Sequence, residues 1–238
     1  MNSANTKQNI NLALEWYAHM GIDVMARSNL DKAAPIKPSK PSSNEPQDKA
    51  SMLAALKNKV MSFDLCALKH TATNTVFGDG AIDASIMIIG EAPGATEDAE
   101  GIPFCGESGK LLDNMLASIG LSRKTNVYIT NTAFWRPPGN RRPSDEEIEQ
   151  CRPFVEEHIA IIDPKLLILV GSTAVESLLG KHLQISKIRQ EHYHYTNKCL
   201  TRSITTTALF HPAYLLRQPM QKKTTWYDLL KIKEFLAL

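Results

Sequence analysis

The sequence is poor in the features that mark several large classes of protein. Its four cysteines are scattered through 238 residues without close pairing, which argues against the disulfide framework of a small secreted domain. There is no apolar run of membrane-spanning length and no recognisable signal peptide, so we expect a cytoplasmic protein with free thiols and no membrane partner. Basic residues outnumber acidic ones by only two, too few to predict a nucleic-acid partner from net charge alone.

Enough apolar sequence is present to bury one sizeable core. Hydrophobic residues make up 43% of the chain and charged residues 22%, which is typical of a single globular domain. Residues 8–20 carry apolar side chains at helical spacing, whereas residues 33–49 are rich in proline and polar side chains. We therefore predict an N-terminal helix within 1–32, a Pro-rich linker at 33–49 and one folded domain at 50–238. Nothing in the sequence demands an oligomer, so a monomer is expected.

Apolar runs typical of buried strands alternate with helical patterns through the predicted domain. The strands are expected at 85–90, 126–130, 165–171 and 205–210, and the helices at 50–61, 111–119, 145–162, 172–179 and 224–236. This alternation predicts an α/β fold with three layers, in which a four-stranded, mainly parallel sheet is covered by helices on both faces. In open sheets of this kind, ligands bind at the carboxyl ends of the strands.

Polar residues follow two of these strands, more than a hundred residues apart in the sequence. The segment Gly-Glu-Ala-Pro-Gly-Ala-Thr-Glu-Asp covers 90–98 and runs on to Pro-Phe at 103–104, and Phe-His-Pro-Ala-Tyr-Leu-Leu-Arg covers 210–217. Both segments are expected at the same edge of the sheet, where one cleft would receive side chains from each. The sequence therefore predicts an enzyme built around one cleft.

Each candidate residue also has an ordinary structural use. Glu91 and Glu97 fit helix-capping or solvated carboxylates, and Asn131, at the end of the second strand, fits a turn former or helix cap. An isolated aromatic residue such as Phe104 usually serves packing, and a histidine beside proline such as His211 is more often structural than catalytic. The residue types and their spacing leave both uses open.

Five motifs in order make the chain resemble the uracil-DNA glycosylase superfamily, and most closely its family 4 branch. Tyr-Ile-Thr-Asn at 128–131 and Trp-Arg-Pro-Pro-Gly-Asn-Arg at 135–141 lie between the segments above, and the resemblance covers roughly residues 66–238. It implies a uracil-DNA glycosylase-like fold. It also implies hydrolysis of the N-glycosidic bond of deoxyuridine in DNA, which leaves an abasic site and begins base excision repair.

The resemblance assigns a role to each candidate residue. It implies that Phe104 stacks on the flipped base and that Asn131 reads uracil at O4 and N3–H, a pattern that cytosine reverses. His211 would hydrogen-bond uracil O2 as negative charge gathers on the leaving base. Glu91 and Glu97 would stabilise the positive charge that develops on the sugar, or position a water molecule.

The resemblance also implies that the partner is uracil-containing DNA. In the superfamily, an apolar side chain from the loop after the fourth strand enters the minor groove and fills the gap left by the flipped nucleotide, and Leu215 and Leu216 are the candidates here. Arg136, Arg141 and Arg217 would then contact phosphates around the mouth of the cleft.

The chain departs from the family at its metal centre. Typical family 4 members hold a four-iron, four-sulfur cluster on four cysteines, of which only Cys66 and Cys151 are present; Phe63 and Trp135 occupy the other two positions. Because two thiolates cannot hold such a cluster, we predict that the chain carries no cofactor and that the two aromatic side chains fill the vacated volume. The alternative is a cluster retained as in the family, although the other two cysteines, Cys105 and Cys199, are not at ligand positions.

Two further functions remain open on the sequence. A non-catalytic module with the same fold would hold uracil-containing or abasic DNA without releasing a base. A hydrolase of free nucleosides would use similar carboxylates but would have no need of Leu215, Leu216 and the surrounding arginines. Release of the base would distinguish a glycosylase from the non-catalytic module. Activity on free deoxyuridine equal to that on DNA would identify the nucleoside hydrolase.

Overall fold

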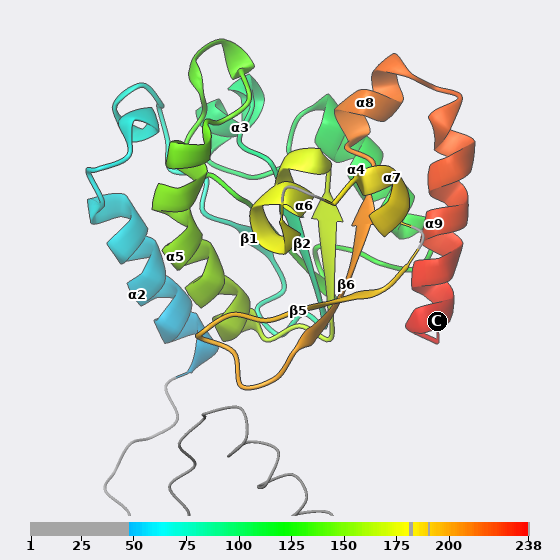
Figure 1. The fold of residues 1–238 in the computed structure, drawn as a ribbon. Coiled ribbons are helices and arrows are strands. Elements are labelled where there is room, and N and C mark those ends of the chain that lie inside the picture. Colours follow the sequence, from blue (N-terminus) through cyan, green and yellow to red (C-terminus); the bar gives the residue numbers. More distant parts are fainter. Residues whose placement is uncertain (1–47, 181–182, 190, 238) are drawn as a thin grey trace, which may run out of the picture. The chain divides into compact units, whose positions relative to one another are not determined.

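The computed structural model describes residues 48–180, 183–189 and 191–237. The predicted N-terminal helix and nearly all of the predicted linker lie outside the described residues. The first described element is α2 (Lys49–Ser62), which confirms the helix predicted at 50–61. It lies beside α5 (Asp145–Ile162), a helix with the predicted bounds (Figure 1).

A six-stranded sheet forms the centre of the described structure. Its four inner strands are parallel and lie in the order β3 (Val127–Asn131), β2 (Ile86–Gly90), β4 (Leu166–Val170) and β6 (Ile204–Leu209). The predicted number of four strands was too low, because β1 (Asp79–Gly80) and β5 (Tyr193–Tyr195) add antiparallel edges beside β3 and β6. Such short strands leave no readable alternation in a sequence.

Helices join the strands and cover both faces of the sheet, as predicted (Figure 1). Besides α2 and α5 they are α3 (Ala95–Glu100), α4 (Glu107–Ala117), α6 (Ser172–Leu179), α7 (Ile185–Ile188), α8 (Pro212–Arg217) and α9 (Gln221–Phe235), with short 3₁₀ turns η1 (Ala67–His70) and η2 (Pro138–Asn140). None of the described helices combines the length and the apolar character that a membrane crossing requires.

Alternate residues of β2 face opposite sides of the sheet. Ile86 and Ile88 pack in a cluster with apolar residues of α4 and α9, whereas Met87 and Ile89 pack with residues of α2, α5, α6 and α7. All four side chains are buried. Burial on both faces explains why the strand appears in the sequence as an uninterrupted apolar run.

The strand order creates a crevice at the carboxyl ends of β2 and β4. From β2 the chain crosses to β3 on one side and later returns to β4 on the other. Such a reversal of direction is the point at which open α/β sheets bind their ligands. We therefore expect the functional site among the residues that follow β2 and β4.

Candidate active site

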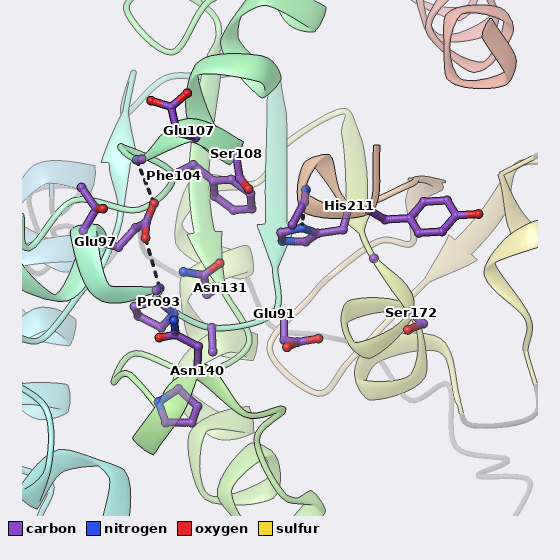
Figure 2. Close-up of a pocket in the computed structure, with 18 of the residues that line it drawn as sticks. Glu91, Pro93, Glu97, Phe104, Glu107, Ser108, Asn131, Asn140, Ser172 and His211 are labelled. Carbon is purple, nitrogen blue, oxygen red and sulfur yellow. Dashed lines mark hydrogen bonds between the residues drawn. The ribbon is translucent and has the colours of Figure 1, made fainter. Parts of the chain in front are cut away.

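A cleft with a volume of about 900 Å³ opens at the carboxyl edge of the sheet, between residues that are distant in sequence (Figure 2). Glu91 enters it from the turn after β2, Asn131 is the last residue of β3, and His211 follows β6 by two residues. Glu97 and Phe104 line the same cleft. The structure thus brings together all five residues that sequence reasoning placed in the catalytic and base-binding set.

Phe104 forms an aromatic wall of the cleft. Its ring centroid lies 5.6 Å from that of the His211 ring, at an interplanar angle of 34°. A Cβ atom placed on Gly90 would come within 2.5 Å of both the Phe104 ring and the amide oxygen of Asn131. Glycine at position 90 therefore lets an aromatic face and an amide converge on one small volume.

Asn131 presents an unsatisfied hydrogen-bond acceptor there. Its side chain is buried, and its Oδ1 atom has no hydrogen-bond partner among the described residues. Buried polar atoms are rarely left without a partner. The site is therefore suited to a planar ligand that stacks on Phe104 and donates an N–H to Oδ1.

His211 is oriented by the helix that it caps. Its Nδ1 accepts a hydrogen bond from the backbone N–H of Ala213 at 3.2 Å, at the start of α8. In a neutral imidazole the proton must then be on Nε2. Burial lowers the pKa of His211 below its usual value, although the negative charge of Glu91 opposes the shift. At neutral pH the ring is therefore neutral, with Nε2–H as its donor.

Glu91 is fixed at both its side chain and its backbone. The hydroxyl of Thr173, a buried residue in the first turn of α6, donates a short hydrogen bond to the carboxylate. The carbonyl of Glu91 accepts hydrogen bonds from the hydroxyl of Thr132 at 2.6 Å and the backbone N–H of Ala133 at 3.2 Å. Sequence reasoning missed Thr173. It follows the predicted strand at 165–171, so the rule that polar residues after strands form the site would have found it.

Glu97 supports the loops that line the cleft. Its carboxylate accepts hydrogen bonds from the backbone N–H groups of Gly94 at 3.1 Å and Gly106 at 2.9 Å (Figure 2). The first bond caps the start of α3, and the second ties that helix to the start of α4. Both carboxylate oxygens thus accept backbone hydrogen bonds, which gives Glu97 a structural task at the wall of the cleft.

The predicted DNA-contacting residues of α8 differ in exposure. Leu215 is fully buried, so its side chain packs inside the protein and not on the surface where a DNA contact was expected. Leu216 is 45% exposed and is thus free to contact a partner. Arg217, the last residue of α8, lines the cleft and has no ion-pair partner in the described ranges.

The other two predicted DNA-contacting arginines are already engaged within the protein. The guanidinium of Arg141 donates two hydrogen bonds to the carboxylate of Glu147, at 2.8 and 2.6 Å. Arg136 donates to the side-chain oxygen of Asn140 at 2.7 Å. Arg141 would have to leave a carboxylate to bind a phosphate, whereas Arg136 would leave only a neutral amide.

The two cysteines at cluster positions form a buried pair. Cys66 and Cys151 are both fully buried, and a hydrogen bond between their thiols lowers the pKa of Cys66 and raises that of Cys151. Within the part of the chain that the structure describes, no three His, Cys, Asp or Glu side chains are grouped so as to hold a metal ion. The residues present therefore do not fit a four-thiolate cluster.

The aromatic residues at the other two cluster positions pack against other side chains of the protein. Phe63 packs edge-on against Phe154, with ring centroids 5.0 Å apart. Trp135 is 1% exposed, and its indole N–H donates to the hydroxyl of Thr75 at 3.0 Å. Trp135 belongs to the same apolar cluster as the paired cysteines, and the half-buried Phe63 packs against that cluster. A packed phenyl ring and a hydrogen-bonded indole thus occupy the two positions at which the resemblance implies metal ligands.

Comparison with known proteins shows the family of the chain. Residues 77–231 match the family model of the uracil DNA glycosylase superfamily. Type-4 uracil-DNA glycosylases from Sulfurisphaera tokodaii and Archaeoglobus fulgidus are each 37% identical, over 76% and 74% of this chain and 84% and 89% of their own lengths. The type-4 enzyme of Thermotoga maritima is 34% identical over 78% of this chain and 95% of its own. The chain therefore belongs to the type-4 family of the uracil-DNA glycosylase superfamily.

Proposed function

We propose that this protein hydrolyses the N-glycosidic bond of deoxyuridine in DNA, releasing uracil and leaving an abasic site that base excision repair then processes. The observation that supports this most directly is the unpartnered Oδ1 of Asn131 beside the ring of Phe104. The relatives that share the fold, named as type-4 uracil-DNA glycosylases, support the same activity.

Uracil satisfies the vacant acceptor, and cytosine does not. The N3–H of uracil donates to Oδ1 of Asn131 while the amide NH₂ donates to O4, and the ring stacks on Phe104. Cytosine has an acceptor at N3 and a donor at N4, so it would leave buried polar groups unpaired. A site built on hydrogen bonds rejects such an analogue strongly.

His211 and Glu91 act on the two products of bond cleavage. As the bond between C1′ and N1 breaks, its electron pair moves onto the base, and the Nε2–H of His211 donates to uracil O2, where the negative charge accumulates. Glu91 stabilises the positive charge on the sugar, and a water molecule then adds to C1′ and loses a proton, while the uracil anion gains one. Glu97 keeps the loops before α3 and α4 in place, because its carboxylate accepts hydrogen bonds from the backbone N–H groups of Gly94 and Gly106.

Base flipping accounts for the exposed groups beside the cleft. A base inside a duplex must leave the stack before it can reach Phe104. Leu216, on the exposed side of α8, is suited to fill the gap, since Leu215 is buried. Arg217 and Arg136 then bind the flanking phosphates, with Arg141 a weaker contributor because it is paired with Glu147.

We further propose that the protein works without an iron–sulfur cluster. The packing of Phe63 and Trp135 and the lack of a four-thiolate set support this. Iron and sulfide should be absent from protein purified without oxygen, and uracil release should survive a chelator. Four irons for each chain would overturn this proposal.

Cleavage of a labelled oligonucleotide with one uracil, scored by alkaline scission, tests the activity. Wild-type protein should produce cleavage, and His211→Ala and Asn131→Ala should each lower the rate at least about tenfold, the scale of one lost transition-state contact. The exposed residues Asn114 and His194 provide matched controls, so Asn114→Ala and His194→Ala should leave the rate unchanged.

Two results would replace the glycosylase with another function. Tight binding of uracil-containing DNA without base release would identify a non-catalytic module. Activity on free deoxyuridine equal to that on DNA would identify a nucleoside hydrolase. The exposed Leu216 and the cationic Arg217 at the cleft favour DNA over a free nucleoside.

A further inference from the structure

Phe104 holds its ring in the cleft from an unusual backbone conformation. Its φ angle is +51°, in the left-handed region that residues other than glycine rarely adopt. A Cβ atom on Gly109 would lie 1.8 Å from the carbonyl oxygen of Phe104, so this carbonyl is pressed against the backbone of α4. Such a conformation persists only where the surroundings enforce it.

Arg123 holds the backbone of Phe104 in this conformation from outside the cleft. Its guanidinium donates to the carbonyl oxygens of Pro103 at 2.9 Å and Phe104 at 2.8 Å. The side chain of Arg123 is only 15% exposed, and the residue is absent from the cleft lining. It therefore contacts the backbone that carries the aromatic wall without being placed to contact a ligand.

Two carboxylates hold the guanidinium in this orientation. Asp79 of β1 accepts a hydrogen bond from Arg123 at 3.1 Å, and Asp113 of α4 accepts one from its Nε at 3.0 Å. Planar N–H groups thus reach four acceptors on three segments of the chain. Lysine would keep the positive charge, but its single ammonium group lacks this fixed, planar set of donors.

We propose that Arg123 is a positioning residue for uracil recognition, which acts by fixing the backbone of Phe104 and thus the angle of its ring. This rests on the proposed base-stacking function of Phe104. Loss of the two carbonyl contacts lets residue 104 relax toward ordinary φ values, and the ring then turns away from the amide of Asn131.

A double-mutant cycle tests whether Arg123 acts through Phe104. Single-turnover rates of uracil release are measured for wild type, Arg123→Lys, Phe104→Leu and the double variant. Arg123→Lys should lower the wild-type rate at least about fivefold, yet less than about twofold when Phe104 is already leucine, because residues that act through each other are not additive. Equal losses in both backgrounds, or no loss in either, would overturn the proposal.

Inhibition by free uracil provides a second readout that a general loss of stability does not move. The inhibition constant should rise at least about fivefold in Arg123→Lys, while affinity for abasic DNA stays within about twofold of wild type. An unchanged inhibition constant would count against the proposal.

Arg202, two residues before β6, offers a matched control away from the cleft lining. Its guanidinium also binds one carboxylate, of Asp163, and two carbonyls, of Asp163 and Pro164. Arg202→Lys should leave both the release rate and uracil inhibition unchanged, and matching losses in this variant would overturn the specific assignment of Arg123. Absence of uracil release by wild-type protein would instead overturn the proposed function itself.

Discussion

The backbone N–H of Ala213 donates to Nδ1 of His211, and this contact decides which ring nitrogen can carry the proton. A protonated ring would turn its Nδ1–H toward the Ala213 N–H, so the cap and the charge exclude each other. Burial acts in the same direction, because it lowers the pKa of His211. The form that can donate from Nε2 and keep the cap is the neutral one.

The rate of uracil release should therefore rise with pH as His211 loses its proton, and level off by about pH 6.5, the ordinary histidine pKa. Because its pKa is lowered, His211 stays neutral down to a more acidic pH than an exposed histidine does. Single-turnover rates between about pH 4.5 and 8 should show this. The rate of the His211→Gln variant should not show this rise with pH. A wild-type rate that increases toward acid would contradict the neutral donor.

Thr173→Val should lower kcat about fivefold with little change in KM, because a hydrogen bond to a charged group is worth about 1.5–3 kcal/mol and part of it is retained by water. The substitution keeps the shape of the side chain but removes the hydroxyl that holds Glu91. Steady-state kinetics on a uracil-containing oligonucleotide measure both parameters. Thr173→Ser, which keeps the hydroxyl, is the control and should recover most of the rate. A larger change in KM than in kcat would assign Thr173 to substrate binding.

Arg217→Ala should weaken binding to DNA. It should also reduce the slope of the logarithm of the binding constant against the logarithm of the salt concentration by about 1, the change expected for one lost phosphate contact. Arg217 lines the cleft without an ion-pair partner among the described residues, so its charge is available to a phosphate. Arg141→Ala should change the salt slope less, because Arg141 is bound to Glu147 by two hydrogen bonds. Binding to abasic DNA at several salt concentrations measures both variants. Equal changes in slope would mean that DNA separates Arg141 from Glu147.

The sequence predicted the position of the site because strands and their ends leave strong local signals. Ile86 to Ile89 form an uninterrupted apolar run, and Glu91 comes directly after Gly90, the last residue of the strand. The start of α5 likewise depends on neighbouring residues, since the hydroxyl of Ser144 accepts a hydrogen bond from the backbone N–H of Glu147 and the Glu147 carboxylate accepts one from the backbone N–H of Ser144. Each of these features depends on residues only a few positions apart.

Features set by distant contacts could not be predicted in this way. Leu215 and Leu216 are neighbours of the same type, and only packing against the rest of the fold buries one and exposes the other. Asp98 sits beside Glu97 in an acidic run, yet it is buried because it accepts hydrogen bonds from the backbone N–H groups of Thr73 and Asn74. Arg123 likewise makes its contacts with segments up to 44 positions away.

A buried histidine outside the cleft should make the fold sensitive to acid. His158 is fully buried between α5 and the sheet, where it stacks on Phe77 and its Nε2 is 3.0 Å from the hydroxyl of Tyr128. Burial lowers its pKa to about 3. In the unfolded chain the group titrates near 6.5, so the unfolded state binds more protons between these two values. The stabilisation is complete above about pH 6.5 and is lost as the pH falls toward 3.

The free energy of unfolding should therefore fall by up to about 1.4 kcal/mol per pH unit from His158 alone in this window. His158→Gln removes the titrating group while keeping a side chain that can pair with the Tyr128 hydroxyl. Urea unfolding at several pH values between about 4 and 7.5 should show a shallower acid dependence in this variant than in wild type, even though the variant is less stable at neutral pH. The exposed His194 serves as the control, and His194→Gln should keep the wild-type slope. Parallel curves for wild type and His158→Gln would show that His158 is protonated as readily in the folded protein as in the unfolded chain, and that its burial does not exclude the charge.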